Sequence, residues 1–554
     1  MTLNAAQALV ATLRHHGVDR AFCVPGESYL PVLDALGAQT AIQLVTCRHE
    51  SGAGYMAVAD AKLTGGPGVV FVSRGPGATN ASIAVHTAEQ DGVPLLLFVG
   101  QVPRRDIGRG AFQEIDYARM FGGIAKQIIV ANDPDRMSAD VAEAMRTSQQ
   151  GTPGPVIVVL PEDVLPEPSH GAIAALPADK AAPPERDKLD AIASAVRGAE
   201  RPLLIAGGGV SSREGRAALK LASEALAIPV VPTFKRQDLF PNTHPNYGGY
   251  LGFKIPKAQV DLLQEADVIL AVGTRLGDVT TQGYTFPAAP RPRQTLIHVH
   301  ADPAVLGRVY QTDHAVVGDP VTFLERLATI RLNPSAARAA WRALLHDRVE
   351  AIMQWRAPDA PGDGVVFGEI VAALKQRLAP DAILITDAGN FSTWVHRYFP
   401  FGERHVLIGA VSGAMGMGVP AAVAAGMRSP GRQIVSFVGD GGFLMTGNEL
   451  ATAIQYRVPV RLFVSNNCSY GTIRMHQEKY FPGRVVATEL RNPDFAKLAE
   501  AFGARGMSIG DASEVAAVVD AALRHDGPVV VDVRTSLRHI SSYATIDDLR
   551  AFSG

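Results

Sequence analysis

The stretch Ile434–Asn467 constrains the fold more than any other part of the chain. The apolar run Ile434–Val438 leads into Gly-Asp-Gly, which is typical of a buried strand entering a tight turn. Phe443–Tyr456 carries apolar residues at helical spacing, and Pro459–Val464 is a second apolar run. A strand, a helix and a strand in this order predict two parallel strands within an α/β sheet.

The turns that follow these two strands should lie together at the carboxyl edge of the sheet, where α/β proteins bind ligands. Asp440 and Asn467 would then place a carboxylate and an amide oxygen at neighbouring strand ends, a combination suited to Mg²⁺. Gly441 and Gly442 leave backbone N–H groups accessible at the start of a helix, which favours a phosphate. Because the predicted metal site and the predicted phosphate site coincide, the sequence predicts a magnesium diphosphate as the ligand.

The combination of Gly439-Asp440-Gly441 with Asn466-Asn467 resembles the signature of thiamine-diphosphate enzymes. The resemblance implies thiamine diphosphate and Mg²⁺ as cofactors, with Asp440, Asn467 and the backbone carbonyl of Ser469 as metal ligands. An ordinary αβ turn is the alternative interpretation of the Gly-Asp-Gly run taken alone.

The rest of the chain alternates helical patterns with short apolar runs, as expected for an α/β protein of three doubly wound parallel-sheet domains. The resemblance implies a pyrimidine-binding domain at 1–165, a central nucleotide-fold-like domain at 188–332 and a diphosphate-binding domain at 360–554. Leu165–Pro184, which is rich in Pro and Ala, reads as a linker, and Leu332–Gly364, which contains a helix followed by a Pro/Gly/Asp stretch, reads as a second one. The predicted strands before the third domain are Ala21–Val24, Ile42–Thr46, Val69–Ser73, Leu95–Val99, Val156–Leu160, Pro202–Ala206, Pro229–Val231, Val268–Val272 and Thr295–His300.

Glu50 follows the predicted strand Ile42–Thr46 and begins a helix. A Glu in the first turn of a helix is favoured by the helix dipole, which is the structural alternative. The run Arg48-His49-Glu50-Ser51-Gly52-Ala53-Gly54 resembles the segment that holds the conserved glutamate of acetolactate-synthase-like enzymes. The resemblance implies that Glu50 protonates N1′ of the aminopyrimidine, so that the cofactor is activated by one positioned acid.

Two further regions of the first domain concern the substrate. Ala111-Phe112-Gln113-Glu114 resembles a segment of acetolactate synthases and implies Gln113 as a residue of the substrate entrance. In Val24-Pro25-Gly26-Glu27-Ser28 the chain departs from the Pro-Gly-Gly-Ala that is usual there, since Glu27 replaces a glycine. If Glu27 is buried near the reacting carbon, a raised pKa would suit it to a proton relay; otherwise it faces solvent or pairs with an Arg.

The other cofactor contacts follow from the same resemblance. The Gly-Asn loop after the apolar run Ala382–Ile385 suits phosphate binding. Met415 corresponds to the methionine that wedges between the two rings of the cofactor, although a core position is the usual role of a methionine. The full set of implied cofactor-binding residues is Gly26, Glu50, Asn80, Gly389, Asn390, Phe391, Gly413, Met415, Gly439, Asp440, Gly441, Gly442, Asn467, Tyr470, Gly471 and Thr472.

Other departures concern flavin and substrate. The run Ala206–Ser212 fails the G-x-G-x-x-G pattern, which counts against a dinucleotide-dependent dehydrogenase. Leu251-Gly252-Phe253-Lys254 lacks the Met-His-Gly that accompanies FAD in acetolactate synthases, and Val279 replaces an expected Arg, so we expect no FAD. His476 stands where a Trp selects the acceptor 2-oxo acid in that family.

Composition narrows the function classes. The chain has 554 residues, 47% of them hydrophobic, and a net charge of −2, so nothing indicates a nucleic-acid or anionic-membrane partner. No apolar run reaches the ~18 residues of a membrane span. The N-terminus reads as an amphipathic helix rather than a signal peptide. The 3 cysteines are too few and scattered for a disulfide framework, and a cytoplasmic location is expected.

The predicted function is that of a carboligase resembling acetolactate synthase. It would decarboxylate a 2-oxo acid, with pyruvate as the expected donor, and join the remaining fragment to a second carbonyl compound. A non-ligating 2-oxo acid decarboxylase or C–C lyase of the same family is the alternative, and Glu27 is its candidate acid. A non-catalytic nucleotide-fold protein is the alternative of another class. The family also implies a homodimer or a dimer of dimers, with the active site at the interface between chains.

Overall fold

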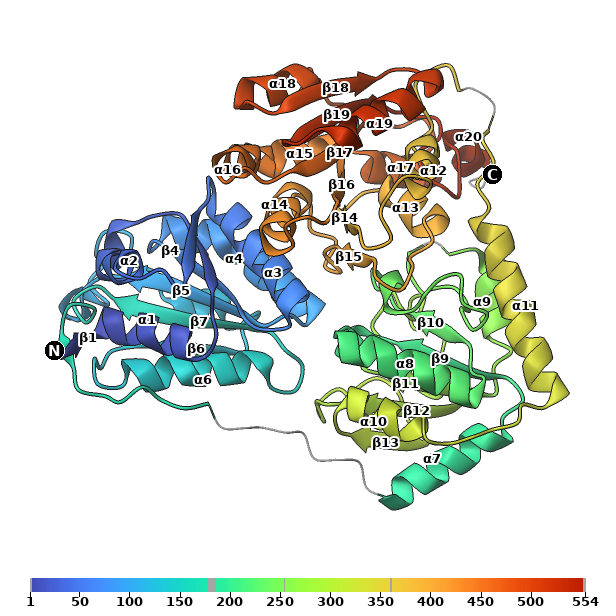
Figure 1. Cartoon of the computed structure of the whole chain (residues 1–554), viewed down its shortest axis with the longest axis horizontal. Coiled ribbons are helices and arrows are strands. Elements are labelled where there is room, and N and C mark those ends of the chain that lie inside the picture. Colours follow the sequence, from blue (N-terminus) through green and yellow to red (C-terminus); the bar gives the residue numbers. More distant parts are fainter. Residues whose placement is uncertain (1, 177–185, 254, 359–360, 552–554) are drawn as a thin grey trace.

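The computed structural model describes residues 2–176, 186–253, 255–358 and 361–551 of the chain. Figure 1 shows three αβ bodies that follow one another along the sequence. Each is built on a sheet whose strands all run parallel. The three-domain α/β prediction is therefore confirmed, while the domain boundaries stay predictions.

The first sheet has the strand order β3-β2-β4-β5-β7-β6. Its strands are β2 (Arg20–Cys23), β3 (Gln43–Thr46), β4 (Gly68–Val72), β5 (Leu95–Gln101), β6 (Gln127–Val130) and β7 (Pro155–Pro161). Its helices are α1 (Ala5–His15), α2 (Leu30–Gly37), α3 (Glu50–Thr64), α4 (Pro76–Asp91), α5 (Tyr117–Phe121) and α6 (Met137–Gln149). The short strand β8 (Pro168–Ser169), inside the predicted first linker, pairs antiparallel with β1 (Leu3–Asn4); residues 177–184 of that linker lie outside the described residues.

The central sheet has the order β10-β9-β11-β12-β13. Its strands are β9 (Pro202–Ala206), β10 (Val230–Pro232), β11 (Val268–Val272), β12 (Thr295–His300) and β13 (His314–Val317). The associated helices are α7 (Arg186–Gly198), α8 (Arg213–Leu226), α9 (Lys257–Leu263), α10 (Pro320–Leu327) and α11 (Ala336–Met353).

The third sheet has the order β15-β14-β16-β17-β19-β18. Its strands are β14 (Ile383–Thr386), β15 (Val406–Ile408), β16 (Ile434–Gly439), β17 (Val460–Asn466), β18 (Arg505–Ile509) and β19 (Val529–Arg534). Its helices are α12 (Gly368–Lys375), α13 (Ser392–Tyr398), α14 (Gly418–Arg428), α15 (Asp440–Thr446), α16 (Leu450–Gln455), α17 (Gly471–Tyr480), α18 (Phe495–Phe502), α19 (Val515–Arg524) and α20 (Ile546–Ala551).

Two details differ from the sequence prediction. Strands β1, β6, β8, β13, β15, β18 and β19 were not predicted; β6 and β13, for example, are edge strands with exposed positions rather than continuous apolar runs. The single helix predicted over Phe443–Tyr456 is wrong: α15 begins already at Asp440, and a 3₁₀ turn at Gly447–Glu449 separates it from α16. No helix among the described residues combines the length and the apolar character that a membrane crossing requires.

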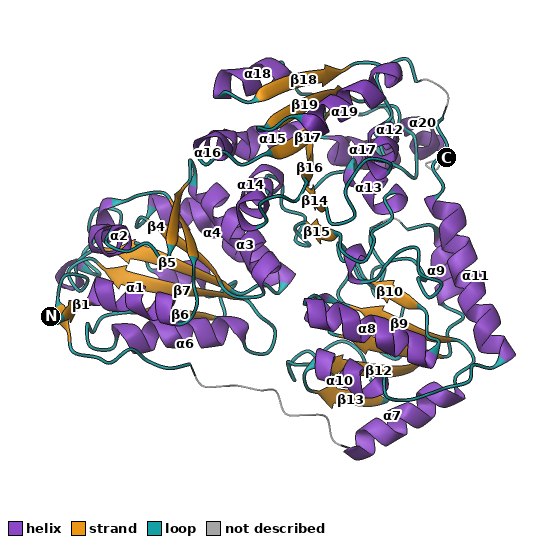
Figure 2. Cartoon of the chain, viewed as in Figure 1, coloured by secondary structure: helices purple, strands orange, loops and turns teal. Residues whose placement is uncertain are grey.

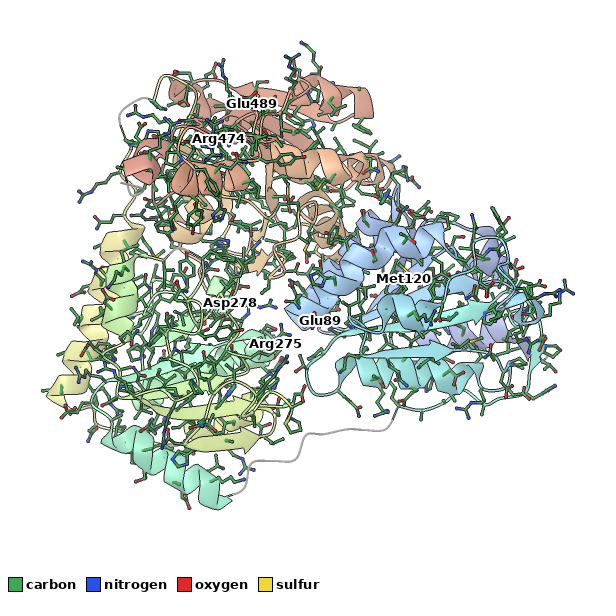
Figure 3. All side chains as sticks on the ribbon, turned by 180° about the vertical axis from the view of Figure 1, so that it is seen from behind. Glu89, Met120, Arg275, Asp278, Arg474 and Glu489 are labelled. Atoms are coloured by element: carbon green, nitrogen blue, oxygen red, sulfur yellow. The ribbon has the colours of Figure 1, made fainter. Side chains whose placement is uncertain are left out.

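The first and third domains share one hydrophobic core. Buried residues of α3 and α4 pack with those of α14, and Figure 2 shows these helices side by side. Arg428 at the end of α14 donates to both Asp60 and Asp19 of the first domain, at 2.7–2.8 Å. The central domain meets the first domain through Arg275, which follows β11 and donates to the backbone carbonyls of Glu89 and Gln90 (Figure 3).

Glu449 fixes the start of α3 from the third domain. Its fully buried carboxylate accepts hydrogen bonds from the backbone N–H groups of Arg48 and His49, both at 2.9 Å, and from the Thr452 hydroxyl at 2.6 Å. Burial raises the pKa of Glu449, and these hydrogen bonds oppose the shift. A Cβ on Gly52 would lie 2.3 Å from Glu449 Oε1, so a glycine is required where the helix meets this carboxylate.

We expect Glu449→Ala to destabilise this domain junction, because it leaves backbone donors without acceptors. The cost should be about 2 kcal/mol, or a drop of roughly 4–8 °C in the first thermal transition. Differential scanning calorimetry measures the shift. Glu500→Ala, at an exposed position on α18, is the matched control and should change nothing. A Glu449→Ala transition at the parental temperature would contradict the role of this junction.

Candidate functional site

The parallel register of β16 and β17 places Gly439 opposite Ser465, so the turns that follow the two strands are neighbours. Asp440 is buried, and its Oδ2 accepts from the Asn492 amide at 2.8 Å and from the Ser469 N–H at 3.3 Å. The Ser469 N–H also donates to Asn467 Oδ1 at 3.0 Å. Cys468 between them has a φ of 52°, and this left-handed turn brings the two side-chain oxygens to the same backbone group.

The chemistry of this oxygen set fits a hard divalent cation. Burial raises the pKa of Asp440, and no basic side chain of the described residues pairs with its carboxylate. The hydroxyl of Ser469 is buried and lacks a hydrogen-bond partner among the described residues. The described residues contain no group of three or more His, Cys, Asp or Glu side chains that is arranged to hold a metal ion. A cation here would therefore rely on one carboxylate, neutral oxygens and the oxygens of its anionic ligand.

Glycines line the cradle beside this oxygen set. A Cβ on Gly441 would lie 2.5 Å from the Tyr470 ring, and one on Gly442 would lie 2.6 Å from Asp387 Oδ2. Gly389 has a φ of 157° and contacts the Phe391 ring, which a Cβ would approach to 2.3 Å. Only glycine leaves the backbone open at these places, as a phosphate that binds to backbone N–H groups requires.

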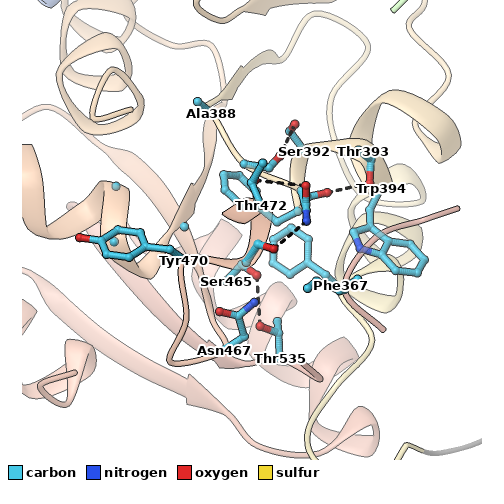
Figure 4. A pocket seen from close by; sticks show the side chains of 18 of the residues that line it. Phe367, Ala388, Ser392, Thr393, Trp394, Ser465, Asn467, Tyr470, Thr472 and Thr535 are labelled. Carbon is cyan, nitrogen blue, oxygen red and sulfur yellow. Dashed lines mark hydrogen bonds between the residues drawn. The ribbon is translucent and has the colours of Figure 1, made fainter. Parts of the chain in front are cut away.

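Asn390 connects two of these loops. Its amide donates to the Gly471 carbonyl at 3.1 Å, and it accepts from the Thr472 hydroxyl at 3.1 Å. Gly471 and Thr472 begin α17, so this pair orients a helix N-terminus toward the cradle (Figure 4). The cradle therefore combines glycine turns, a helix N-terminus and an oxygen set whose chemistry fits a cation.

All of these groups line one cavity of about 430 Å³. Met415 lies in the wall of the cavity. The Cε atom of Met415 would be 3.5 Å from a Cβ on Gly441, so the methionine side chain packs against the glycine turn. The Met415 carbonyl accepts from the Tyr55 hydroxyl of α3 at 3.1 Å. The predicted residues in the lining are Gly389, Asn390, Phe391, Gly413, Met415, Gly439, Asp440, Gly441, Gly442, Asn467, Ser469, Tyr470, Gly471 and Thr472.

The predicted residues of the first domain lie elsewhere. Glu50 is the first residue of α3, and its Oε2 accepts from the Asn80 amide at 2.9 Å. Gly26 packs against Ser73, to which a Cβ would approach within 2.6 Å. No described residue of the first domain lines the cavity. The fold of one chain thus builds two separate groups, one around Glu50 and one around Asp440.

Glu27 and Gln113 also belong to the first group. The side chain of Glu27 is 67% exposed in this chain and pairs with Arg74 at 3.0 Å, which is the alternative to a buried proton relay. Gln113 has a φ of 63°, and its carbonyl would lie 2.8 Å from a Cβ on Gly75. The catalytic roles of Glu27, Glu50 and Gln113 stay predictions.

Three protein-family models of thiamine pyrophosphate enzymes match the sequence of the chain. The N-terminal thiamine-pyrophosphate-binding domain matches residues 3–120, the central domain 189–327 and the C-terminal thiamine-pyrophosphate-binding domain 387–533. The chain belongs to the thiamine pyrophosphate enzyme family. The predicted cofactor class is therefore confirmed, and the chain is an enzyme that depends on thiamine diphosphate.

Curated relatives extend the likeness over nearly the whole chain. The acetolactate synthase large subunit of Parasynechococcus marenigrum is 34% identical, covering 96% of this chain and 87% of the relative. That of Corynebacterium glutamicum is 31% identical, covering 96% and 86%. The large subunit of acetolactate synthase isozyme 1 of Escherichia coli is 31% identical, covering 96% and 94%.

Sequence reasoning missed Asp387, which supports two loops of the cavity wall without itself lining the cavity. Its buried carboxylate accepts from the N–H groups of Ala388 at 2.8 Å and of Gly416 at 3.0 Å. Burial raises the pKa of Asp387, and these backbone hydrogen bonds oppose the shift. One side chain thus ties the Gly389 loop to the Met415 loop. An Asp two residues after the predicted strand Ala382–Ile385 was the signal available in the sequence.

Asp387→Ala should weaken thiamine diphosphate binding by about tenfold or more, since the two loops lose the acceptor that aligns them. Asp387→Asn, which keeps an acceptor oxygen, should lose less. Isothermal titration calorimetry with the cofactor measures both. Asp494→Ala, at an exposed position of the same domain, is the control. An affinity of Asp387→Ala equal to that of the parent would show that the loops are aligned without Asp387.

Proposed function

We propose that this protein is a thiamine-diphosphate- and Mg²⁺-dependent carboligase that resembles acetolactate synthase. It would decarboxylate a 2-oxo acid, with pyruvate as the donor, and join the remaining fragment to a second carbonyl compound. The similarity to acetolactate synthase large subunits across 96% of the chain is the observation that carries this proposal.

Each residue group has a role in the proposed reaction. Asp440, Asn467 and Ser469 would hold Mg²⁺, and the Gly441–Gly442 and Gly471–Thr472 amides would bind the diphosphate. Met415 would separate the cofactor rings. Glu50, held by Asn80, would keep a proton at N1′ of the aminopyrimidine. The bound cofactor supplies a carbon nucleophile that adds to the substrate carbonyl.

Product analysis separates this function from the non-ligating alternative. The cofactor-loaded protein is incubated with pyruvate, alone and with a second 2-oxo acid or an aldehyde, and the products are identified by mass spectrometry. We expect 2-acetolactate or another 2-hydroxy ketone. Free aldehyde without a ligation product would identify a simple decarboxylase instead, with Glu27 as the candidate acid. A lack of any product from a broad set of 2-oxo acids would refute the proposal.

We further propose that the active site forms between two chains of a homodimer, or a dimer of dimers. The separation of the Glu50 group from the cavity of the same chain supports this, because the cofactor must reach both groups. A two-fold axis would let the first domain of each chain complete the cavity of the other.

Subunit mixing tests this arrangement. Glu50→Gln should lower activity by ~10²-fold or more, and Asp440→Ala should abolish cation-dependent cofactor binding. In a mixed dimer, one site carries both defects and the other carries neither, so co-expression should restore part of the activity. If mixed dimers form but remain inactive, Glu50 and Asp440 of one chain serve the same site.

We propose that the protein works without FAD, on the sequence departures at Phe253, Lys254 and Val279. An absorption spectrum of the purified protein with a stoichiometric flavin band would refute this.

A further inference from the structure

The cavity continues beyond the cofactor loops into the central domain. Phe234, Tyr250 and Phe253, from the loops that follow β10, form an aromatic wall. The rings of Phe234 and Phe253 meet edge to face with centroids 5.1 Å apart. Two basic side chains, Lys235 and His396, also line this part of the cavity. Among the described residues, neither side chain forms a hydrogen bond or ion pair with Asp440, Asn467 or Ser469.

Lys235 is buried at 3% exposure and crosses to the third domain. Its ammonium donates to the Thr386 carbonyl at 3.2 Å and to the Asp387 carbonyl at 3.5 Å, the second at the limit of a hydrogen bond. Among the described residues no carboxylate pairs with Lys235. Its φ of 54° is unfavourable for a residue with a side chain, and such strain is concentrated at functional sites.

The two carboxylates near Lys235 already have other hydrogen-bond partners. Asp91 of α4 pairs with Lys62 of α3 and accepts from the Val411 and Ser412 N–H groups at 2.7 and 3.2 Å. Asp387 is held by backbone N–H groups. Burial lowers the pKa of Lys235 to about 8, with Asp387 and Asp91 opposing the shift and Lys62 adding to it. Lys235 is therefore mostly cationic at neutral pH, with a donor to spare.

His396 provides a second polar group without a hydrogen-bond partner among the described residues. It is 5% exposed, and both of its ring nitrogens are buried without a hydrogen bond among the described residues. Burial and the charge of Lys235 lower the pKa of His396 to about 3, so the ring is neutral and offers one donor and one acceptor. Buried polar atoms are normally hydrogen-bonded, so an unpartnered ring that lines a cavity points to a ligand or water.

We propose that Lys235 and His396 form a subsite for the acceptor substrate, which is a 2-oxo acid with an apolar side chain. Lys235 binds its carboxylate, His396 binds a neighbouring oxygen, and the wall of Phe234, Tyr250 and Phe253 contacts the side chain. This inference rests on the proposed carboligase function. An aldehyde acceptor would leave Lys235 without its counterion.

The chemistry of the two substrates explains why this subsite suits the acceptor. The donor loses its carboxylate as CO₂, and a cation bound to that carboxylate would stabilise the ground state more than the transition state, in which the charge leaves the group. The acceptor keeps its carboxylate throughout the reaction. A cation therefore helps only when it binds the acceptor.

A binding experiment tests the subsite without turnover. Benzoate and its neutral analogue benzamide are titrated into the cofactor-loaded protein by calorimetry. We expect benzoate to bind at least tenfold more tightly than benzamide, and Lys235→Met to remove this preference while leaving benzamide binding unchanged. Lys257→Met, at an exposed position of the central domain, is the control. Equal binding of benzoate to Lys235→Met and parent would overturn the proposal.

The pH dependence of the parent protein decides the question even if Lys235→Met fails to fold. Benzoate stays anionic and His396 stays neutral above pH 7, whereas Lys235 loses its proton as the pH rises through about 8. We expect benzoate affinity to fall at least tenfold between pH 7 and pH 10, with benzamide affinity constant. A flat benzoate profile would contradict a role for the Lys235 cation.

Kinetics connect the subsite to the acceptor. Lys235→Met should raise the KM for an acceptor 2-oxo acid at least tenfold, with donor decarboxylation and ligation to an aldehyde kept near the parental rate. An equal loss with both kinds of acceptor would refute an acceptor-specific role. If the parent makes no product from any 2-oxo acid, the proposed function fails, whereas the benzoate titration still reports whether the anion subsite exists.

Discussion

The register of β16 against β17 is the constraint on which the candidate cofactor site depends. Because Gly439 lies opposite Ser465, the chain leaves both strands at the same edge of the sheet, and the turn at Cys468 then brings the oxygens of Asp440 and Asn467 to the Ser469 N–H. A one-residue shift would reverse the direction of every side chain and separate the two oxygens. The buried core on both faces of this sheet, formed by apolar residues such as Phe437 and Val464, fixes the register.

Buried carboxylates hold the backbone around this site, two of them across the boundary between the first and third domains. Glu449 holds the start of α3, and Asp91 holds the 411–412 backbone of the third domain. Asp387 joins two loops within the third domain. Each accepts from backbone N–H groups, and such charge-assisted hydrogen bonds are stronger than neutral ones. The loops that meet the cofactor are thereby aligned by residues that do not line the cavity.

The central domain contributes side chains to the cavity. Its loops line one end of the cavity with aromatic rings, and its Lys235 donates a hydrogen bond to Thr386 of the third domain. The same part of the sequence departs from the flavin-containing pattern at Phe253 and Lys254. We infer that the space between the central and third domains serves to bind the substrate.

The sequence by itself determined the α/β class, the three domains and the group of Asp440, Asn467 and the flanking glycines, because strand ends and glycine turns are local features. It also located Glu50 at the start of α3. Only the tertiary structure decided that Glu50 lies apart from the cavity of its own chain, that Glu27 is exposed beside Arg74, and that Asp387, Lys235 and His396 support or line the cavity. These outcomes depend on packing between residues distant in sequence, such as Lys235 against Thr386, and no periodicity or motif encodes such contacts.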